Sequence, residues 1–280
     1  MSRVSEFRPE YGLVGAGAVA TGLLGRLPER ARLIGPVVGV SFRVASRIVN
    51  SLRAGEAVRS IAELDRARII LLSGSPAFLP ELFAILSSPE WSLDGRTIIC
   101  CDCDPEASLL ASCATQGARV ASIRRVPLGD RLIVEGDALA VPAATRLVTR
   151  LGMKPIQVPS ASRSLFDAAI TLGTTVTSGI ADRVFRMLQD AGLRDKEALR
   201  LATLLISQTA NDYERTGRQS WAWHVRAPDV ERLEAQIDAS GKEFGPLFRR
   251  LLVLALNDFE KHPHDAAKLN SPVRSGPVSD

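Results

Sequence analysis

YGLVGAGAVA, residues 11–20, is the stretch of this sequence that decides its fold. Residues 11–14 are apolar and predict a buried strand, and the apolar helix-formers up to Leu27 predict a helix. The glycines between them allow a sharp turn and let a phosphate approach the backbone, and the small Ala20 lets the helix pack close to the strand. The pattern indicates a dinucleotide-binding βαβ unit, although a tight turn without a ligand would also use it. The cofactor contacts that it predicts are Gly15, Ala16, Gly17, Ala18 and Val19.

Strand-like and helical patterns alternate beyond this turn as far as Pro159, and the pattern is helical after it. Alternation predicts an α/β fold with a Rossmann-type, doubly wound parallel sheet, followed by an all-helical C-terminal domain. The strands are expected at 11–14, 37–40, 69–72, 97–101, 119–123, 132–135 and 155–158, and the helices at 18–27, 44–54, 78–86, 106–116, 136–151, 161–191, 196–215, 228–239 and 244–259. The expected organisation is a disordered N-terminus (1–10), a dinucleotide-binding domain (11–159), a helical dimerisation or substrate domain (160–260) and a disordered tail (261–280).

Composition narrows the class of protein. The 280 residues are 46% hydrophobic with a net charge of +4, so a sizeable core is expected. The basic residues are scattered among acids, which argues against nucleic-acid binding and suits a small anionic ligand. The sequence contains no uncharged apolar run of about 20 residues, so no membrane span is expected. The polar N-terminus lacks the apolar segment of a secretory signal, so a cytoplasmic location is expected.

Four cysteines lie close together, at positions 100, 101, 103 and 113. Cys100 and Cys103 have the spacing of one CxxC pair, but there is no second pair and no histidine is near, so we expect no metal site. Cys100 and Cys101 end an apolar run, as in a buried strand, and we interpret the group as structural. A redox role for Cys103 is the alternative.

The residues after the second strand discriminate between dinucleotides. An acid there would bind the ribose hydroxyls of NAD, but this chain continues with Ser41, Phe42 and Arg43, and Arg47 follows one helical turn later. A hydroxyl and a guanidinium suit a 2′-phosphate, so the sequence predicts NADP(H). Solvated surface arginines are the alternative. The missing acid also argues against S-adenosylmethionine methyltransferases. Ser73 and Gly74 follow another strand and are further predicted cofactor contacts, unless they form an ordinary turn.

Residues 11–260 resemble a group of Rossmann-like bacterial proteins with a C-terminal helical domain of unknown function. This group is distantly related to deazaflavin-dependent NADP reductases, ketopantoate reductases and 6-phosphogluconate dehydrogenases. The resemblance implies an NADP-binding fold. It rests on the glycine turn at 15–17, Val38-Gly39-Val40-Ser41 with Arg43, Val134-Glu135-Gly136-Asp137, Leu165-Phe166-Asp167-Ala168-Ala169 and Arg226-Ala227-Pro228-Asp229.

The motifs that would lie near the substrate differ from those of this group. Cys100-Cys101-Asp102 is not followed by the usual His-Thr-Ser-Gly, and Arg125-Val126-Pro127 replaces Leu-His-Pro. Phe166-Asp167-Ala168-Ala169 replaces Tyr-His-Ala-Ala, and Thr175 replaces an Asn. The group's histidines are absent, and the three that this chain has, His224, His262 and His264, lie elsewhere.

Two clusters could take part in chemistry. Asp167, Thr171 and Thr175 are spaced by four on a predicted helix, so they share a face that could bind a polar substrate or relay a proton. The alternative is a helix whose threonines bond back to its own backbone. Trp221, Trp223 and His224 lie in one predicted loop and could form a lid or a subunit contact, or pack beneath the loop.

Two hypotheses for function follow. The first is an NADP-dependent oxidoreductase that transfers hydride to or from a small molecule at the cleft between the domains. The second is a non-catalytic nucleotide-binding or interaction protein that kept the fold and lost the catalytic acid. The long apolar helix that opens the second domain predicts a homodimer in either case.

Overall fold

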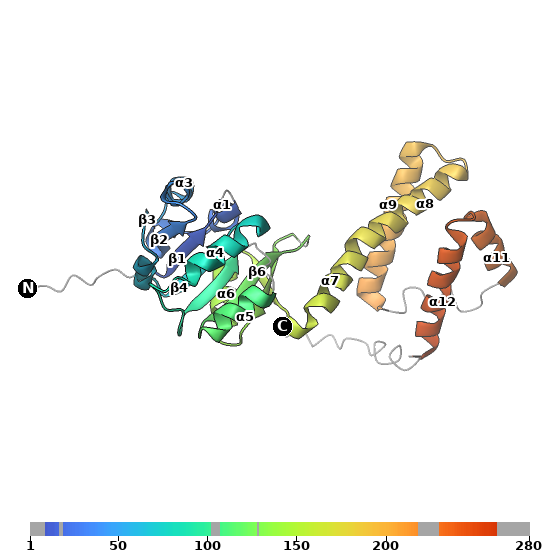
Figure 1. Ribbon diagram of the computed structural model, residues 1–280. Helices are drawn as coiled ribbons and strands as arrows, with labels where there is room; N and C mark the ends of the chain where they lie inside the picture. The colour runs from blue at the N-terminus through green and yellow to red at the C-terminus, as the bar shows by residue number, and fades with distance from the viewer. Residues whose placement is uncertain (1–8, 17–18, 102–106, 128, 218–229, 262–280) are drawn as a thin grey trace, which may run out of the picture. The chain divides into compact units, whose positions relative to one another are not determined.

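The computed structural model describes residues 9–16, 19–101, 107–127, 129–217 and 230–261. It divides into two compact units, residues 1–171 and 172–280 (Figure 1). The sequence places the domain boundary at Pro159, whereas this division falls within the helical stretch that follows. The reason is that the first helical turns after Pro159 form ion pairs with the sheet, as described below. Within the described ranges, no helix has the length and hydropathy to cross a membrane.

The first unit is built on one eight-stranded sheet with the order β3-β2-β1-β4-β5-β6-β7-β8. Its first six strands are parallel and have the order of a Rossmann-type sheet. The strands are β1 (Tyr11–Gly15), β2 (Ile34–Gly39), β3 (Glu56–Ala57), β4 (Ile69–Ser73), β5 (Thr97–Cys101), β6 (Arg119–Arg125), β7 (Arg131–Gly136) and β8 (Lys154–Gln157).

Helices cover both faces of this sheet. Every residue of β1 and β4 is buried, as expected for strands packed on both sides. One face packs against α1, α3 and α6 through residues such as Leu24, Ile48 and Leu147, and the other against α4 and α5 through residues such as Leu82. The helices of this unit are α1 (Val19–Leu24), α2 (Arg30–Leu33), α3 (Phe42–Leu52), α4 (Leu79–Leu86), α5 (Ala107–Thr115), α6 (Val141–Arg150) and α7 (Arg163–Thr171), with 3₁₀ turns at Ile61–Arg66, Pro76–Phe78 and Ser160–Ser162.

The sheet is mostly parallel, as predicted, but its last two strands depart from this direction. β7 is antiparallel to β6, and β8 is parallel to β7, so both run opposite to the other six strands. Only five residues, 126–130, join β6 to β7. A connection of this length can form a hairpin but cannot hold the crossover helix that a parallel neighbour requires.

The predicted helix start at Gly136 is also wrong, because α6 begins at Val141. Gly136 has a φ of 136° and ends β7 instead. Asp137 then pairs with β6: its N–H donates to the Val120 carbonyl and its carboxylate accepts from the Val120 N–H, each over 2.8 Å. The short elements α2 and β3 were not predicted, since neither is long enough to show a hydrophobic period.

In the described part of the second unit, helices pack in pairs, which Figure 1 shows as α8 beside α9 and α11 beside α12. The long helix predicted at 161–191 is not uniform, because a π-helical segment, Leu172–Val176, separates α7 from α8. Among the described residues, few side chains of this unit are buried: Ala198, Ala202, Ile237 and Ser240. Its helices are α8 (Thr177–Asp190), α9 (Asp195–Thr216), α11 (Val230–Ala239) and α12 (Gly245–Lys261).

Candidate functional site

The carboxyl ends of β1, β2 and β4 meet at one edge of the sheet. Gly15 is in register with Gly39 on one side and with Ser73 on the other. The Ala16 N–H donates to the Ser73 carbonyl over 3.0 Å, which carries the pairing of β1 with β4 beyond the last strand residue. The strands that follow β1 are added on one side of it up to β3, and β4 then begins the other side, so the strand order reverses between β1 and β4. Such a switch point is where ligands of doubly wound sheets bind.

The helices approach this edge closely at two glycines, and at Gly39 the close atom belongs to the backbone. A Cβ on Gly39 would lie 2.8 Å from the Ala45 backbone nitrogen, and one on Gly74 would lie 2.7 Å from a methyl group of Leu82. The absence of these side chains therefore lets α3 and α4 approach the ends of β2 and β4. Of the predicted turn, Gly17 and Ala18 lie outside the described residues, as does the side chain of Val19.

The end of β2 leads directly into α3. Ser41 is extended, and its hydroxyl accepts from the Val44 N–H over 3.3 Å as the N-cap of this 11-residue helix. Arg43 lies in the first turn with an exposed side chain, and within the described part of the chain no carboxylate pairs with it. The positive end of the helix dipole and a free guanidinium thus lie where the second strand ends.

Arg59 is a residue of this edge that the sequence analysis missed. Its guanidinium carbon lies 4.3 Å from the centroid of the Phe42 ring, which is 42% exposed. Arg59 follows β3 and is 17 residues from Phe42 in sequence, so no local pattern connects them. The structure therefore adds a second guanidinium to the group of Ser41, Phe42 and Arg43.

A buried ion-pair network connects β6, β7 and α7 inside the first unit. The Oε1 atom of Glu135 accepts from the Ser122 hydroxyl and from Nε of Arg124, both over 3.0 Å. Arg124 also donates to Asp167 over 3.1 Å. Arg163 lies 3.3 Å from Glu135 and 3.9 Å from Asp167. The Glu135 side chain is 5% exposed, so these guanidinium groups neutralise a carboxylate that water scarcely reaches.

This network changes the interpretation of the predicted helix face. Asp167 is paired with Arg124 and Arg163, and the Thr171 hydroxyl donates to the Asp167 carbonyl over 3.0 Å, which is the back-bonding alternative. Thr175 lies in the π-helical segment, whose wider turn interrupts the four-residue spacing. The structure therefore brings Asp167 together with arginines of the sheet and of its own helix, with Thr171 one turn later in α7 and Thr175 in the π-helical segment beyond it.

The surroundings of the described cysteines favour a structural role. Cys100, Cys101 and Cys113 are fully buried and form no disulfide, and burial raises the pKa of the Cys113 thiol to about 11. Within the described ranges no group of three His, Cys, Asp or Glu residues could hold a metal ion. Cys103 and the loop with Trp221, Trp223 and His224 lie outside the described residues.

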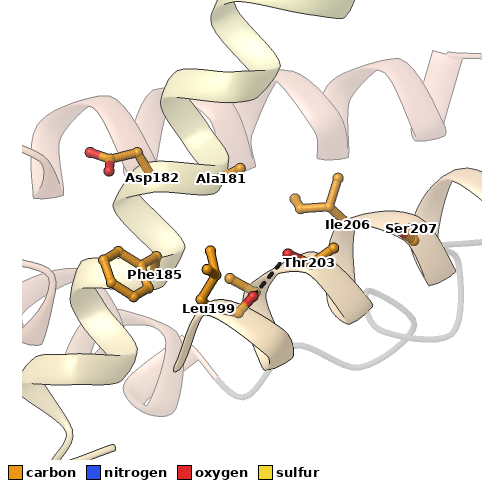
Figure 2. Close-up of a pocket in the computed structure, with 8 residues that line it drawn as sticks. Ala181, Asp182, Phe185, Leu199, Thr203, Ile206 and Ser207 are labelled. Atoms are coloured by element: carbon orange, nitrogen blue, oxygen red, sulfur yellow. Dashed lines mark hydrogen bonds between the residues drawn. The ribbon is translucent and has the colours of Figure 1, made fainter. Parts of the chain in front are cut away.

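The second unit contains a mainly apolar pocket of about 360 Å³ between α8 and α9. Figure 2 shows the residues that line it, which include Asp182 and Phe185 of α8 and Leu199, Thr203 and Ile206 of α9. The Thr203 hydroxyl donates to the Leu199 carbonyl over 2.9 Å, so one of the two hydroxyls on the α9 wall, the other being that of Ser207, is already used within its helix. The pocket accordingly offers apolar contact and few free polar groups.

Comparison with known proteins supports the fold. The family model described as a domain of unknown function, DUF2520, matches residues 131–252. A protein from Thermotoga maritima is 16% identical, with a TM-score of 0.62 over 91% of this chain and 100% of its own. A candidate NADP oxidoreductase from Bacteroides fragilis is 14% identical, with a TM-score of 0.68 over 91% of this chain and 98% of its own.

A reductive aminase from Aspergillus terreus, solved with NADPH and ethyl levulinate, is 15% identical, with a TM-score of 0.59 over 93% of this chain and 98% of its own. No curated protein matches the chain. These structural similarities confirm the predicted fold class, a Rossmann-type sheet followed by a helical region.

Proposed function

We propose that this protein is an NADP-dependent oxidoreductase that acts on a small molecule. The observation that carries the proposal is the edge formed by β1, β2 and β4, where Gly15 ends the first strand and Arg43 follows the second. Arg43 is exposed and has no carboxylate partner among the described residues, so it is available to a 2′-phosphate. The similarity to an NADPH-bound reductive aminase supports the same cofactor.

Each part of this edge would hold a different part of the cofactor. Gly15 and Ala16 lead into the turn that would accept the pyrophosphate, while Ser41, Phe42 and Arg43 would surround the adenosine end, with Arg59 stacked on Phe42. Ser73 and Gly74 would line the backbone side of the crevice. When bound, the nicotinamide would supply hydride transfer.

Binding measurements test the choice of cofactor. We expect NADPH, titrated against the full chain by nicotinamide fluorescence, to bind more tightly than NADH. The Arg43→Ala substitution should weaken NADPH about tenfold or more, as expected for a lost charge-assisted contact, and should leave NADH unchanged. Arg200→Ala, an exposed arginine of α9, is the matched control. No binding of either nucleotide, or an equal loss for both, would contradict the proposal.

A specific observation favours a second function, a nucleotide-binding protein without catalysis. Asp167, the one carboxylate of the predicted catalytic face, is held by Arg124 and Arg163. A carboxylate in two ion pairs orders its surroundings and is poorly placed to transfer a proton to a substrate. NADPH binding without turnover on a panel of carbonyls and imines would favour this second function over the first.

The homodimer stays a proposal, and the surface of the second unit supports it. Leu199, Leu204 and Leu205 of α9 are 58%, 59% and 47% exposed, and the unit has few buried apolar side chains of its own in its described part. Exposed apolar surface of this extent is typical of a subunit interface. A cytoplasmic location also stays a proposal, with which the described cysteines agree, since they are buried and outside any disulfide.

A further inference from the structure

A basic cavity lies at the amino edge of the sheet, away from the proposed cofactor edge. Its volume is about 560 Å³, within the range of small-molecule sites. It is formed where β1 and β4 begin and where α2 and α6 end. The polar groups that line it are four arginines and one carboxylate: Arg32, Arg68, Arg146, Arg150 and Glu10.

The single carboxylate is already used. Glu10 forms an ion pair with Arg150, whose guanidinium also donates to the Tyr11 hydroxyl over 3.1 Å. Arg32, Arg68 and Arg146 are exposed, and within the described part of the chain no carboxylate pairs with them. The cavity therefore carries three guanidinium groups whose charge the described residues do not balance.

The positions of these arginines are imposed by the fold. The backbone N–H groups of Arg68 and Ile69 both donate to the Glu10 carbonyl, over 3.2 and 3.0 Å, which sets Arg68 beside the start of β1. Arg146 and Arg150 are four residues apart on α6, so they share one face, where like charges repel each other and destabilise a helix. A bound anion would remove this repulsion.

We propose that this cavity binds a phosphate-bearing anion of metabolite size. Guanidinium groups present planar pairs of donors that match phosphate oxygens, and several of them converging on one cavity give both charge and geometry. The site is independent of the proposed dinucleotide edge, because its residues precede β1 and β4 or lie in α2 and α6, whereas the cofactor residues follow β1, β2 and β4.

Calorimetric titration of the full chain with inorganic pyrophosphate, at an ionic strength held constant with sodium chloride, tests the proposal. We expect saturable binding that the double substitution Arg68→Gln/Arg146→Gln weakens by at least about tenfold. The control Arg131→Gln/Arg200→Gln removes the same charge elsewhere and should leave the affinity unchanged. Binding that does not saturate, or that weakens equally in the control, would overturn the proposal.

Two further measurements separate this site from the others. A saturating concentration of NADPH should leave pyrophosphate affinity unchanged; competition between the two would place the anion at the cofactor edge and overturn the proposal. Arginine modification of the unsubstituted protein by phenylglyoxal, mapped by mass spectrometry, should show pyrophosphate protecting Arg68 and Arg146. Unchanged modification of both would contradict the site without relying on how a variant folds.

Discussion

At the scale of single residues, Glu135 shows how far a side chain's surroundings can differ from what its sequence position suggests. It lies in a short strand beside Val134, yet its carboxylate is buried among Ser122, Arg124 and Arg163. Its second oxygen, Oε2, has no hydrogen-bond partner among the described residues. A buried carboxylate of this kind is tolerated only because two guanidinium groups lie beside it.

Tyr11 provides a prediction at this scale. Burial, together with the neighbouring Glu10 carboxylate, raises the pKa of its phenol from 10.0 to about 12, although Arg150 acts in the opposite direction. Because the folded state holds this proton more tightly, its contribution to stability is complete below pH 10 and falls as the pH rises from 10 to 12.

The chain has two tyrosines, so Tyr213→Phe isolates the phenol of Tyr11. Ultraviolet absorbance of the phenolate should then show a midpoint at about 12. The reciprocal variant, Tyr11→Phe, identifies which phenol is observed. A midpoint at 10 in the folded Tyr213→Phe protein would mean that the phenol is not buried beside Glu10.

At the scale of elements, the connection from β7 to α6 shows how one glycine shapes a junction. Gly136 has a positive φ, and a Cβ there would lie 2.3 Å from the Val120 carbonyl oxygen and 2.5 Å from the Ala121 Cα. The close approach lets Asp137 continue the pairing with β6 before the helix begins. This junction explains why α6 starts later than the sequence predicts.

Substitution of Gly136 by alanine should therefore lower the free energy of unfolding by more than about 2 kcal/mol, because the backbone of β6 would have to move. Gly179 in α8 is the matched control, since a Cβ there would meet no heavy atom within 4 Å. Gly179→Ala should stabilise its helix by up to about 1 kcal/mol. Urea unfolding followed by circular dichroism distinguishes the two, and equal effects would contradict this account of the junction.

At the scale of the whole molecule, the two units differ in how they bury apolar surface. The first unit has a layer of buried side chains on each face of its sheet. The second buries few in its described part, and it exposes apolar residues on α9 and α12, among them Leu204 and Leu254 at 59% each. This contrast is why a second copy of the chain is proposed to cover the helical unit.

Light scattering should accordingly give a mass near twice the 30.2 kDa of the chain. Leu204→Glu/Leu205→Glu should shift the protein to the mass of one chain, because charge would enter an apolar interface. Leu139→Glu, at a site 68% exposed in the first unit, should leave the dimer intact. A single-chain mass for the unsubstituted protein would refute the dimer.

The sequence was most informative where a segment's own residues determine its structure. The buried strands around 11–14 and 69–72 and the helices over 44–54 and 78–86 were predicted close to their observed bounds, because hydrophobic period depends on local order alone. Prediction was poorer for the direction of β7 and the start of α6, which depend on pairing with β6. The site divides in the same way: Arg43 followed from its strand, while Arg59 did not.

The sequence by itself determined the first buried strand, the absence of an acid after the second strand and most of the alternation of strands and helices, since each is written in adjacent residues. Only the tertiary structure decided that Asp167 is paired with arginines of β6 and α7, that Arg59 stacks on Phe42, and that Arg68 and Arg146 line one cavity. These juxtapositions join residues 4 to 78 positions apart in the sequence. Most of them depend on how the elements pack together, which no local pattern of residues records.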